Sequence, residues 1–407
     1  MSTVVDGHDS VIETESVRFA DVNGDGRDDL CYALGGVVRC HYRDIPSGSP
    51  DACEFDANYL ETEFNFHLVA GLDHSTTIGV SDLNQDNRLD VCARGPDGIH
   101  CSKNYQNATF YSPYRWTTRF SDAEGWDEES KYSTLKYVDV DGDGRTDVCG
   151  REDEGIRCLF SNGYWFIDGG IVTEHGDFSN SDLTAWTNWG SSPTHYETID
   201  FADIDDDGDL DVCGRGRHGI YCALFDYPTR TFEKETRWVS NQFLDAYGWN
   251  QEPYGTTIQF GDINGDGAAD VCGRGGANIY CGVANVTQSR FDGADQGAAS
   301  IAFPYWDGWN AENRYDTIVM TDADGDGLQD MCGRGYAGIY CAFSESTIFG
   351  GISFTDPTST IVSTFGDNGS WHTREQFWGS VQPASVNSNP ADSEFCGVGW
   401  AGVYCSQ

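Results

Sequence analysis

The sequence predicts an all-β protein built from seven repeats of about 60 residues, and three observations carry that prediction. Cysteines recur in seven pairs with the spacing C-x8-C. An acidic turn, with glycine in five of the six cases, precedes six of these pairs. Around each turn, β-branched or aromatic residues alternate with polar ones, which is the pattern of strands and hairpins. A fixed period marks a repeat architecture, so we expect residues 1–407 to form a single domain.

The third repeat shows the unit. A strand-like segment at 132–140 leads into the acidic turn, and shorter strands follow at 148–151 and 155–160. Roughly 25 to 30 variable residues then leave room for a fourth strand. Four-stranded sheets repeated four to eight times describe a β-propeller, whereas an open solenoid needs polar capping repeats. The sequence therefore predicts seven four-stranded antiparallel blades, with the N-terminal strand Ser2–Val5 closing the ring and covering the sheet edges.

The cysteine pairs indicate the compartment. Zinc sites use closer pairs such as C-x2-C, so seven identical wide spacings favour disulfides. In a hairpin with a two-residue turn, cysteines nine apart face each other closely enough to bond. Disulfides persist in oxidising compartments, so we expect a secreted, extracellular protein. Cys53 is left over, and we expect either a free thiol or a disulfide-linked dimer. The first cysteines of the pairs are Cys31, Cys92, Cys149, Cys213, Cys272, Cys332 and Cys396.

Charge excludes two classes of partner. The chain has 66 acidic and 24 basic residues, a formal charge of −42, which repels nucleic acid and anionic membranes. No apolar run approaches the length of a membrane span. The N-terminal segment MSTVVDGHDSVIETE lacks the features of a signal peptide, so we expect that a secretory leader has been removed.

Six acidic turns share the pattern Asp-x-[Asp/Asn]-x-Asp-x-x-x-Asp, with the carbonyl oxygen of position 7 as a further ligand. Such oxygen ligands suit Ca²⁺, and a cation would relieve the repulsion between crowded carboxylates. The alternative is a set of Asx-turns without metal. The predicted ligands of about six Ca²⁺ ions are Asp21, Asn23, Asp25, Arg27, Asp29; Asp82, Asn84, Asp86, Arg88, Asp90; Asp139, Asp141, Asp143, Arg145, Asp147; Asp203, Asp205, Asp207, Asp209, Asp211; Asp262, Asn264, Asp266, Ala268, Asp270; and Asp322, Asp324, Asp326, Leu328, Asp330.

These turns are not EF-hands, because position 12 lacks the bidentate Glu and the flanking segments are strands. With Asp at position 9, the repeats resemble the FG-GAP (VCBS-type) repeats of integrin α-subunit propellers and fungal propeller lectins. That resemblance implies a seven-bladed propeller with calcium in the loop between the first two strands of a blade. The seventh repeat departs from the pattern, since Val386, Ser388 and Pro390 occupy ligand positions. We expect no calcium there.

The face opposite the acidic turns is the predicted ligand surface, because the interblade segments end there. These segments carry a recurring Trp and Tyr, and the adjacent C-G-R triplet supplies an Arg. Aromatic rings pack on sugar rings while forked donors bind hydroxyl groups. The alternative is that Trp wedges between blades and Arg pairs with a neighbouring blade. The predicted ligand-binding residues are Trp126, Tyr132, Arg151, Trp189, Tyr196, Arg215, Trp249, Tyr254, Arg274, Trp309, Tyr315 and Arg334.

We therefore predict a calcium-stabilised, multivalent lectin whose partners are glycans or glycoproteins. Neither G-x-S-x-G nor H-E-x-x-H occurs, and none of the nine His recurs at a fixed repeat position, so an enzyme is disfavoured. Two alternatives stay open. One is an integrin-like adhesion propeller, and the other is a polysaccharide lyase or hydrolase with an unrepeated catalytic residue.

Overall fold

The protein is all-β, and its strands pair in antiparallel sheets throughout the part of the chain that the computed structural model describes. Among those residues, five sheets have four strands and two have three, and each begins a new repeat. The described residues are 16–34, 37–43, 55–62, 77–105, 109–174, 176–182, 187–234, 236–238, 242–293, 302–346, 352–355, 365–367, 378–385, 394–399 and 402–405.

Each repeat starts with a short inner strand and a longer second strand. The inner strands are β1 (Arg18–Ala20), β5 (Gly79–Ser81), β11 (Lys136–Val138), β15 (Asp200–Ala202), β21 (Gln259–Gly261), β25 (Val319–Thr321) and β30 (Gln382–Ala384). The second strands are β2 (Asp29–Leu34), β6 (Asp90–Gly95), β12 (Asp147–Glu152), β16 (Asp211–Gly216), β22 (Asp270–Arg274), β26 (Asp330–Arg334) and β31 (Glu394–Gly399).

The third and fourth strands continue each sheet outward. The third strands are β3 (Val37–Arg43), β7 (Gly98–Ser102), β13 (Gly155–Ser161), β17 (Gly219–Ala223), β23 (Ile279–Asn285), β27 (Ile339–Ala342) and β32 (Gly402–Cys405). The fourth strands are β4 (Phe55–Thr62), β10 (Tyr114–Thr117), β14 (Phe166–Ile171), β20 (Thr236–Arg237) and β24 (Arg290–Asp292). Separate two-stranded sheets are β8 (Asn104–Tyr105) with β9 (Thr109–Phe110), β18 (Phe225–Asp226) with β19 (Thr231–Phe232), and β28 (Ser344–Ser346) with β29 (Ile352–Phe354).

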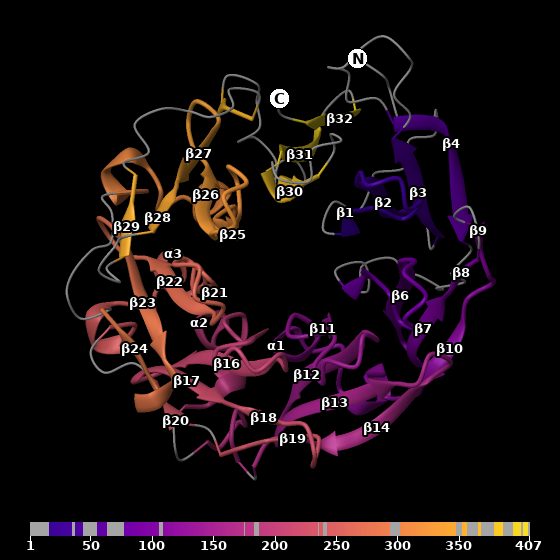
Figure 1. The fold of residues 1–407 in the computed structure, drawn as a ribbon, viewed down its shortest axis with the longest axis horizontal. Helices are drawn as coiled ribbons and strands as arrows, with labels where there is room; N and C mark the ends of the chain where they lie inside the picture. Colours follow the sequence, from indigo (N-terminus) through magenta and orange to yellow (C-terminus); the bar gives the residue numbers. More distant parts are fainter. Residues whose placement is uncertain are drawn as a thin grey trace.

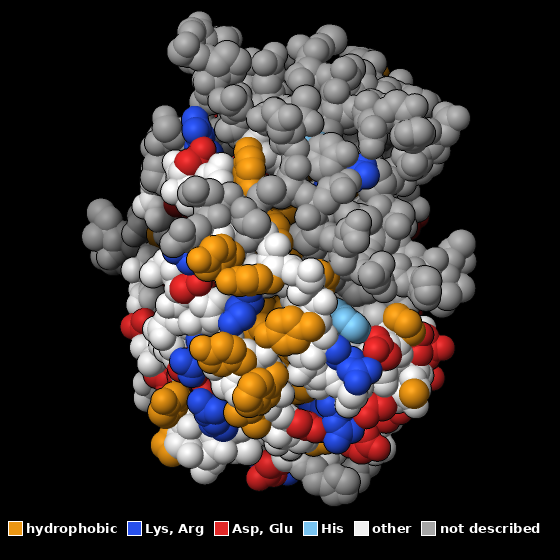
Figure 2. All heavy atoms as spheres, turned by 90° about the vertical axis from the view of Figure 1, so that its right-hand side faces the viewer, with side chains coloured by type: hydrophobic (Ala, Val, Ile, Leu, Met, Phe, Trp, Pro, Cys, Tyr) orange, Lys and Arg blue, Asp and Glu red, His pale blue; other side chains and the backbone are white. Residues whose placement is uncertain are grey.

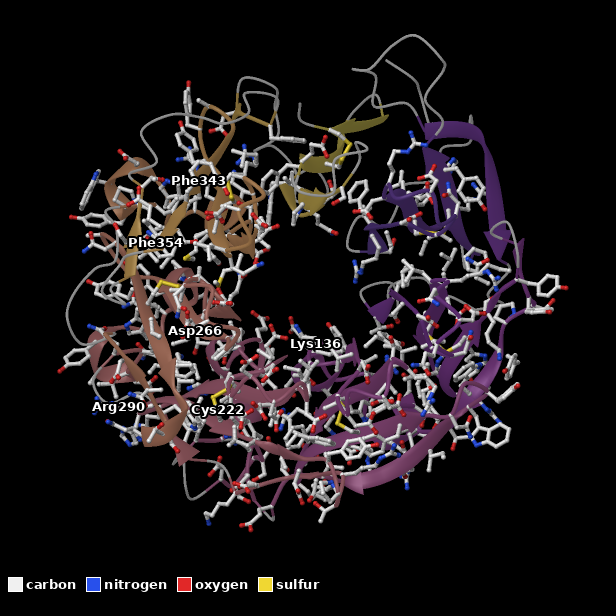
Figure 3. All side chains as sticks on the ribbon, viewed as in Figure 1. Lys136, Cys222, Asp266, Arg290, Phe343 and Phe354 are labelled. Carbon is white, nitrogen blue, oxygen red and sulfur yellow. A yellow bond between two sulfur atoms is a disulfide. The ribbon has the colours of Figure 1, made fainter. Side chains whose placement is uncertain are left out.

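The sheets follow one another around a common centre, and the inner strands face that centre (Figure 1). The side chain of Lys136 on β11 points inward in Figure 3, and its Nζ lies 3.2 Å from Asp200 Oδ1 on the next inner strand. The first and last repeats also meet. Asp28 N–H donates to the Ser385 carbonyl at 2.7 Å, and the Gln382 side chain donates to the Val17 carbonyl at 3.0 Å. The predicted closing strand Ser2–Val5 lies outside the described residues.

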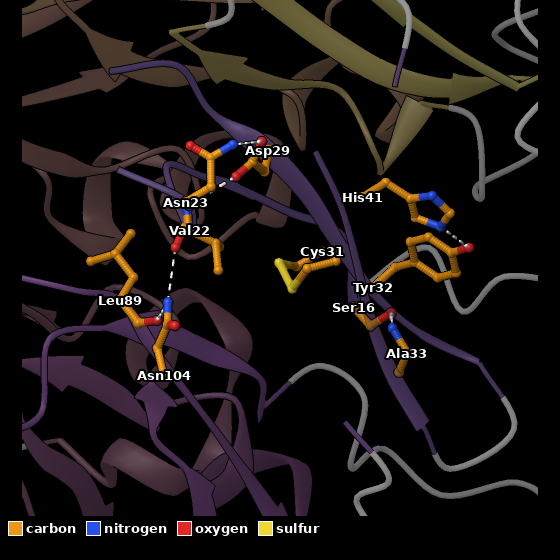
Figure 4. The surroundings of a disulfide bond; sticks show 11 residues. Ser16, Val22, Asn23, Asp29, Cys31, Tyr32, Ala33, His41, Leu89 and Asn104 are labelled. Carbon is orange, nitrogen blue, oxygen red and sulfur yellow. Dashed lines mark hydrogen bonds between the residues drawn. A yellow bond between two sulfur atoms is a disulfide. The ribbon is translucent and has the colours of Figure 1, made fainter. Parts of the chain in front are cut away.

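Seven disulfides staple the hairpins of the second and third strands. In the fourth repeat Cys213 opposes Cys222 across β16 and β17, and Gly216 opposes Gly219, which places Arg217 and His218 in the turn. Each bond joins cysteines nine residues apart, so the predicted local pairing is confirmed. Figure 4 shows the surroundings of the first one. Cys53 lies outside the described residues, and nothing in them supports the predicted disulfide-linked dimer.

The core lies between neighbouring sheets. One cluster joins Cys149, Ile156 and Cys158 of the third repeat to Val212 and Tyr221 of the fourth. Because both faces of each sheet meet a neighbour, the second strands are almost entirely buried, and every residue of β16 is. Continuous burial explains why their sequences read as short runs rather than as clean alternation.

Four one-turn helices precede inner strands at the end of the sheets away from the acidic loops: α1 (Glu129–Tyr132), α2 (Pro193–Tyr196), α3 (Glu252–Gly255) and α4 (Glu312–Tyr315). Single 3₁₀ turns are η3 (Asp122–Glu124), η4 (Trp189–Ser191), η5 (Asp245–Tyr247), η6 (Val286–Gln288) and η8 (Tyr305–Asp307). In the described residues, all helices are too short to cross a bilayer.

Candidate functional site

The acidic loops join each inner strand to the second strand, and their carboxylates organise the loop backbone. In the sixth loop Asp322 accepts hydrogen bonds from the N–H groups of Gly325, Asp326 and Gly327 at 2.7–3.1 Å. Position 6 of the second loop, Asn87, has φ 61°, the left-handed conformation expected there. The loops therefore have the tight turn that the sequence pattern predicts.

The Asp at position 9 ties each loop to its sheet. In the fourth loop Asp211 Oδ2 accepts the Ile204 N–H at 3.0 Å and Oδ1 accepts the Phe225 N–H at 2.8 Å. Asp211 is only 1% exposed. Burial, partly offset by these hydrogen bonds, raises its pKa to about 8. Burial raises the pKa of the corresponding residues to about 7 for Asp90, about 8 for Asp147 and Asp270, and about 6 for Asp330.

Loops with Asp at position 3 differ from loops with Asn there. Where position 3 is Asn, its amide donates to the position-9 carboxylate, as Asn84 does to Asp90 at 2.9 Å. Where it is Asp, three carboxylates crowd together with ligand atoms within 4.8 Å of one another. These clusters are Asp139, Asp141, Asp147; Asp203, Asp205, Asp211; and Asp322, Asp324, Asp330.

The three clusters fit a metal ion. Asp205 Oδ1 is buried without a hydrogen-bond partner, and burial together with the charges of Asp207 and Asp203 raises the Asp205 pKa to about 6. A bound cation would satisfy that oxygen and remove the repulsion. In the loop of the third repeat, Arg230 of the following repeat also reaches the cluster, with Nη2 2.7 Å from Asp141 Oδ2. The predicted empty seventh site, at Val386, Ser388 and Pro390, lies outside the described residues.

Successive loops are joined by backbone hydrogen bonds. The N–H of position 8 in one loop donates to the carbonyl of position 1 or 2 in the loop before it. These bonds are Thr146 to Asp82 at 2.8 Å, Leu210 to Val140 at 3.1 Å, Ala269 to Asp203 at 2.7 Å and Gln329 to Asp262 at 2.8 Å. Order in one loop therefore supports order in the next.

The four predicted ligand-binding Trp residues are buried, and this corrects the prediction that they contact a glycan. Trp126, Trp189, Trp249 and Trp309 are at most 5% exposed. Each packs on the glycine of the C-G-R triplet. A Cβ built on Gly273, for example, would lie 2.9 Å from Trp249 Cζ3. The triplet needs glycine because the indole occupies the space of a side chain.

The four predicted ligand-binding Arg residues are also buried, because they fasten one repeat to the segment leading into the next. Arg215 is 0% exposed, and its guanidinium donates to the carbonyls of Thr194 and Phe243 and to Asp245 Oδ1 at 2.8–3.2 Å. The corresponding arginines make equivalent bonds: Arg151 to Asn180, Arg274 to Phe303 and Asn310, and Arg334 to Asp367. The packing alternative is therefore correct for these side chains.

The predicted Tyr residues lie on the short helices. Tyr196 is buried, whereas Tyr132, Tyr254 and Tyr315 are half-buried. Burial and the nearby carboxylates of Glu312 and others raise the Tyr315 pKa to about 12. Tyr254 lies under Arg274, 5.1 Å from guanidinium carbon to ring centroid. Tyr254 and Tyr315 pack against the core clusters that contain Trp249 and Trp309, so these two rings belong to the same packed segments as the buried Trp residues.

Sequence reasoning missed the aromatic residues that this face exposes. Tyr247, Tyr305, Trp306 and Tyr336 are 55–64% exposed. The first three lie in the same interblade segments as the buried Trp residues, two to four positions earlier. The only signal in the sequence was position, since these aromatics do not share one position across the third to sixth repeats as the packing Trp does.

A pocket of about 550 Å³ opens on this face beside the turn of β16 and β17. It lies between two interblade segments, and its lining includes a carboxylate, two imidazoles, a guanidinium, two amides and hydroxyl groups. The lining residues are Thr187, Asn188, Ser191, His195, Arg217, His218, Asp245, Ala246 and Asn250.

Two ionisable side chains, His195 and Asp245, lie beside each other in the pocket. His195 is 8% exposed, and neither ring nitrogen has a hydrogen-bond partner. Its Nε2 is 3.9 Å from Asp245 Oδ1, which is within ionic reach but too long for a hydrogen bond. Burial opposes ionisation of Asp245, but His195 and Arg215 outweigh it and lower the Asp245 pKa. The pocket thus presents the ionised Asp245 carboxylate as a hydrogen-bond acceptor, and the buried Arg215 holds that carboxylate in place.

Comparison with known proteins identifies the fold. No family model and no curated protein matches the chain. Among solved structures, it is similar to a lectin of Agrocybe aegerita described as recognising non-reducing terminal N-acetylglucosamine, with 22% identity, a TM-score of 0.75, and coverage of 98% of this chain and 90% of that one. The chain shares the fold of that lectin.

Two other likenesses are weaker. The Tc holotoxin pore of Photorhabdus luminescens has 14% identity and a TM-score of 0.44, covering 80% of this chain and 14% of that one. BBS1N, solved in complex with ARL6DN, has 9% identity and a TM-score of 0.44, covering 96% and 90%. Both TM-scores are too low to support an argument about function.

Proposed function

We propose that the protein is an extracellular lectin with a closed, seven-bladed propeller fold, stabilised by Ca²⁺ in its acidic loops. The pocket around His195 and Asp245 is the observation that supports glycan binding most directly. Its volume lies within the range typical of small-molecule sites, about 300–1,000 Å³. Neutral hydroxyl groups need both donors and acceptors, and the pocket supplies both. The lectin of the same fold recognises a terminal sugar, which favours the same class of ligand here.

Closure and blade number have separate support. The hydrogen bonds from Asp28 to Ser385 and from Gln382 to Val17 join the first repeat to the last. Seven disulfide hairpins, one in each repeat, supply seven candidate blades. Seven local disulfides also favour an oxidising, extracellular environment.

Calcium is the metal that the loop chemistry favours, because hard carboxylate and amide oxygens are its preferred ligands. Six loops carry the pattern, and the three with Asp at position 3 should bind most tightly since more negative charge meets the ion. When bound, the ion would supply stability rather than chemistry. In the fourth repeat, whose hairpin turn lines the pocket, the predicted ligands Asp203, Asp205 and Asp211 would hold the ion.

The repeated architecture supports the proposal that binding is multivalent. Other repeats place an acid or amide against the buried Arg, as Asp122 does with Arg94 at 2.6 Å and Asp367 does with Arg334. Each such position is a candidate for a pocket related to the one at Asp245. Several weak sites would together bind a densely glycosylated surface far more tightly than a free sugar.

A glycan array with and without Ca²⁺ tests the function, and calorimetry with a bound oligosaccharide tests the site. Asp245→Asn should reduce the stoichiometry by one site or weaken that site by about tenfold or more. Asp292→Asn is a charge-matched control, because Asp292 pairs with Arg290 on β24 and lies outside the pocket lining. Absence of any array signal, or cleavage of a bound glycan, would overturn the proposal.

A further inference from the structure

A second group of aromatic side chains lies on the outer wall of the ring, on the second and third repeats. In the second repeat, Tyr105 lies on β8, Tyr111 lies between β9 and β10, and Tyr114 begins β10. In the third repeat, Tyr164 and Trp165 lie in the turn before β14. These five rings, here called the rim patch, are 43–63% exposed. Figure 2 views this side of the ring and shows hydrophobic side chains gathered there with basic side chains between them.

The rim patch is held together across two repeats. The Tyr114 hydroxyl donates to the Tyr164 carbonyl at 2.9 Å, and Lys103 Nζ donates to the Gly163 carbonyl at 2.7 Å. The same ammonium lies 4.2 Å from the centroid of the Tyr164 ring. Beneath these rings, buried Trp116 packs on Phe166 with centroids 5.1 Å apart. The side chains of Tyr114 and Tyr164 are therefore held in place by contacts between the two repeats.

Blade packing does not require this exposure. In the corresponding hairpin of the fourth repeat, residues 225–232, Phe225 and Phe232 are buried and Tyr227 is the single exposed aromatic. Large exposed apolar patches on soluble proteins mark interaction sites more often than chance exposure does. The second and third repeats therefore carry a surface that the fourth lacks.

Charge selects the kind of partner. Around the rim patch, the arginines and acids pair with each other: Arg115 with Asp97 at 2.8 Å, and both Arg119 and Arg157 with Asp168 at 2.7 Å. Arg119 also pairs with Glu124 and Arg157 with Glu152, each at 2.8 Å, so with Lys103 the four basic side chains face four acidic ones. The patch is thus close to neutral on a chain of charge −42. A second copy of the chain would bring another −42 to the contact, and long-range repulsion opposes that association. An uncharged partner meets no such penalty.

We propose that the rim patch is a second carbohydrate-binding surface, which takes an extended, uncharged polysaccharide chain. Tyr and Trp rings pack on the apolar faces of sugar rings, and the paired Arg and Asp side chains at the edge can exchange hydrogen bonds with hydroxyl groups. Neighbouring rings are tilted, by 50° for Tyr105 and Tyr111 and by 47° for Tyr164 and Trp165. Tilted rings suit a soluble chain that turns along its length rather than a flat crystalline surface.

Affinity electrophoresis in gels containing soluble neutral polysaccharides tests the proposal, with mixed-linkage β-glucan, galactomannan and glucomannan as probes and the full chain as the protein. At least one gel should retard the protein. The double variant Tyr164→Ala/Trp165→Ala should weaken retardation by about two- to tenfold for each ring lost. Tyr227→Ala is the matched control and should migrate as the parent does.

The pocket variant Asp245→Asn keeps the two carbohydrate surfaces distinguishable, since it should leave retardation in these gels unchanged. Failure of the lectin proposal would therefore not affect this result. Lack of retardation in every gel would overturn the rim proposal, and so would equal retardation of the parent and the double variant. Sedimentation velocity provides the other decisive outcome: self-association that the double variant abolishes would assign the patch to a second copy of the chain instead.

Discussion

Replacing Trp249 by Ala tests whether the recurring Trp residues pack or bind. Trp249 is 3% exposed, and its ring contacts Phe243 edge-on with centroids 4.6 Å apart and Tyr280 at 6.0 Å. The indole also covers Gly273, which has no side chain to fill the space that would be left. A Trp→Ala change in a site that cannot collapse costs about 3–5 kcal/mol of unfolding free energy. We therefore expect the upper part of that range.

Urea denaturation in saturating Ca²⁺, followed by intrinsic fluorescence and circular dichroism, measures this loss. Tyr247→Ala is the matched control, because Tyr247 is two residues away and 64% exposed, and its change should stay within about 0.5 kcal/mol. Gly273→Ala approaches the same contact from the other side. Its new Cβ would lie 2.9 Å from Trp249 Cζ3 and from Ile258 Cγ1, so we expect a loss of about 1–3 kcal/mol.

The refuting result is specific. Suppose that Trp249→Ala lowers stability by less than about 1 kcal/mol while glycan stoichiometry falls by one site. The indole would then be a ligand contact, and its burial against Gly273 would not describe the protein in solution.

Three further predictions concern the loops, the central surface and the disulfides. Chelation should lower the unfolding midpoint, and added Ca²⁺ should restore it. Each site adds about 2.7 kcal/mol to the unfolding free energy when free Ca²⁺ is a hundredfold above the Kd of that site. An unchanged melting curve in chelator would contradict this. Burial and the charges of Asp316, Glu129 and Glu252 raise the Glu197 pKa from 4.5 to about 7. The folded protein therefore keeps the full contribution of Glu197 to its stability below pH 4.5, where Glu197 is protonated in both states, and loses the part that depends on this proton as the pH rises through 7. Glu197→Gln should therefore leave the stability unchanged at pH 4 and raise it by about 1 kcal/mol at pH 8, a value already reduced for solvent screening. Melting curves at the two pH values measure this, and a larger gain at pH 4 than at pH 8 would refute it. Removing one disulfide, with Cys213→Ala/Cys222→Ala, should cost at most about 2–3 kcal/mol because each bond closes a short loop, and denaturant titration with and without reductant measures it.

The predictions from sequence that the structure confirms depend on residues close together in the chain. Cys213 and Cys222 are nine positions apart, so hairpin geometry alone brings them together. The loop turn at Asn87 needs only a residue that tolerates positive φ. The repeat period and the all-β class follow from the same local patterns, counted along the chain. None of these features requires knowledge of which repeats are neighbours in space.

The use of each repeated side chain could be decided only by the tertiary structure. Trp249 and Tyr247 stand two residues apart in one segment, yet one is buried on Gly273 and the other is exposed. In the sequence, Arg215 resembles a forked hydrogen-bond donor for a ligand. In the structure, its guanidinium instead donates to Asp245, in the segment that leads to the next repeat. The pocket at His195 forms because two interblade segments, residues 187–195 and 245–250, meet beside the turn at Arg217. A repeating pattern identifies positions under a common constraint, whereas burial between neighbouring sheets determines whether that constraint is packing or binding.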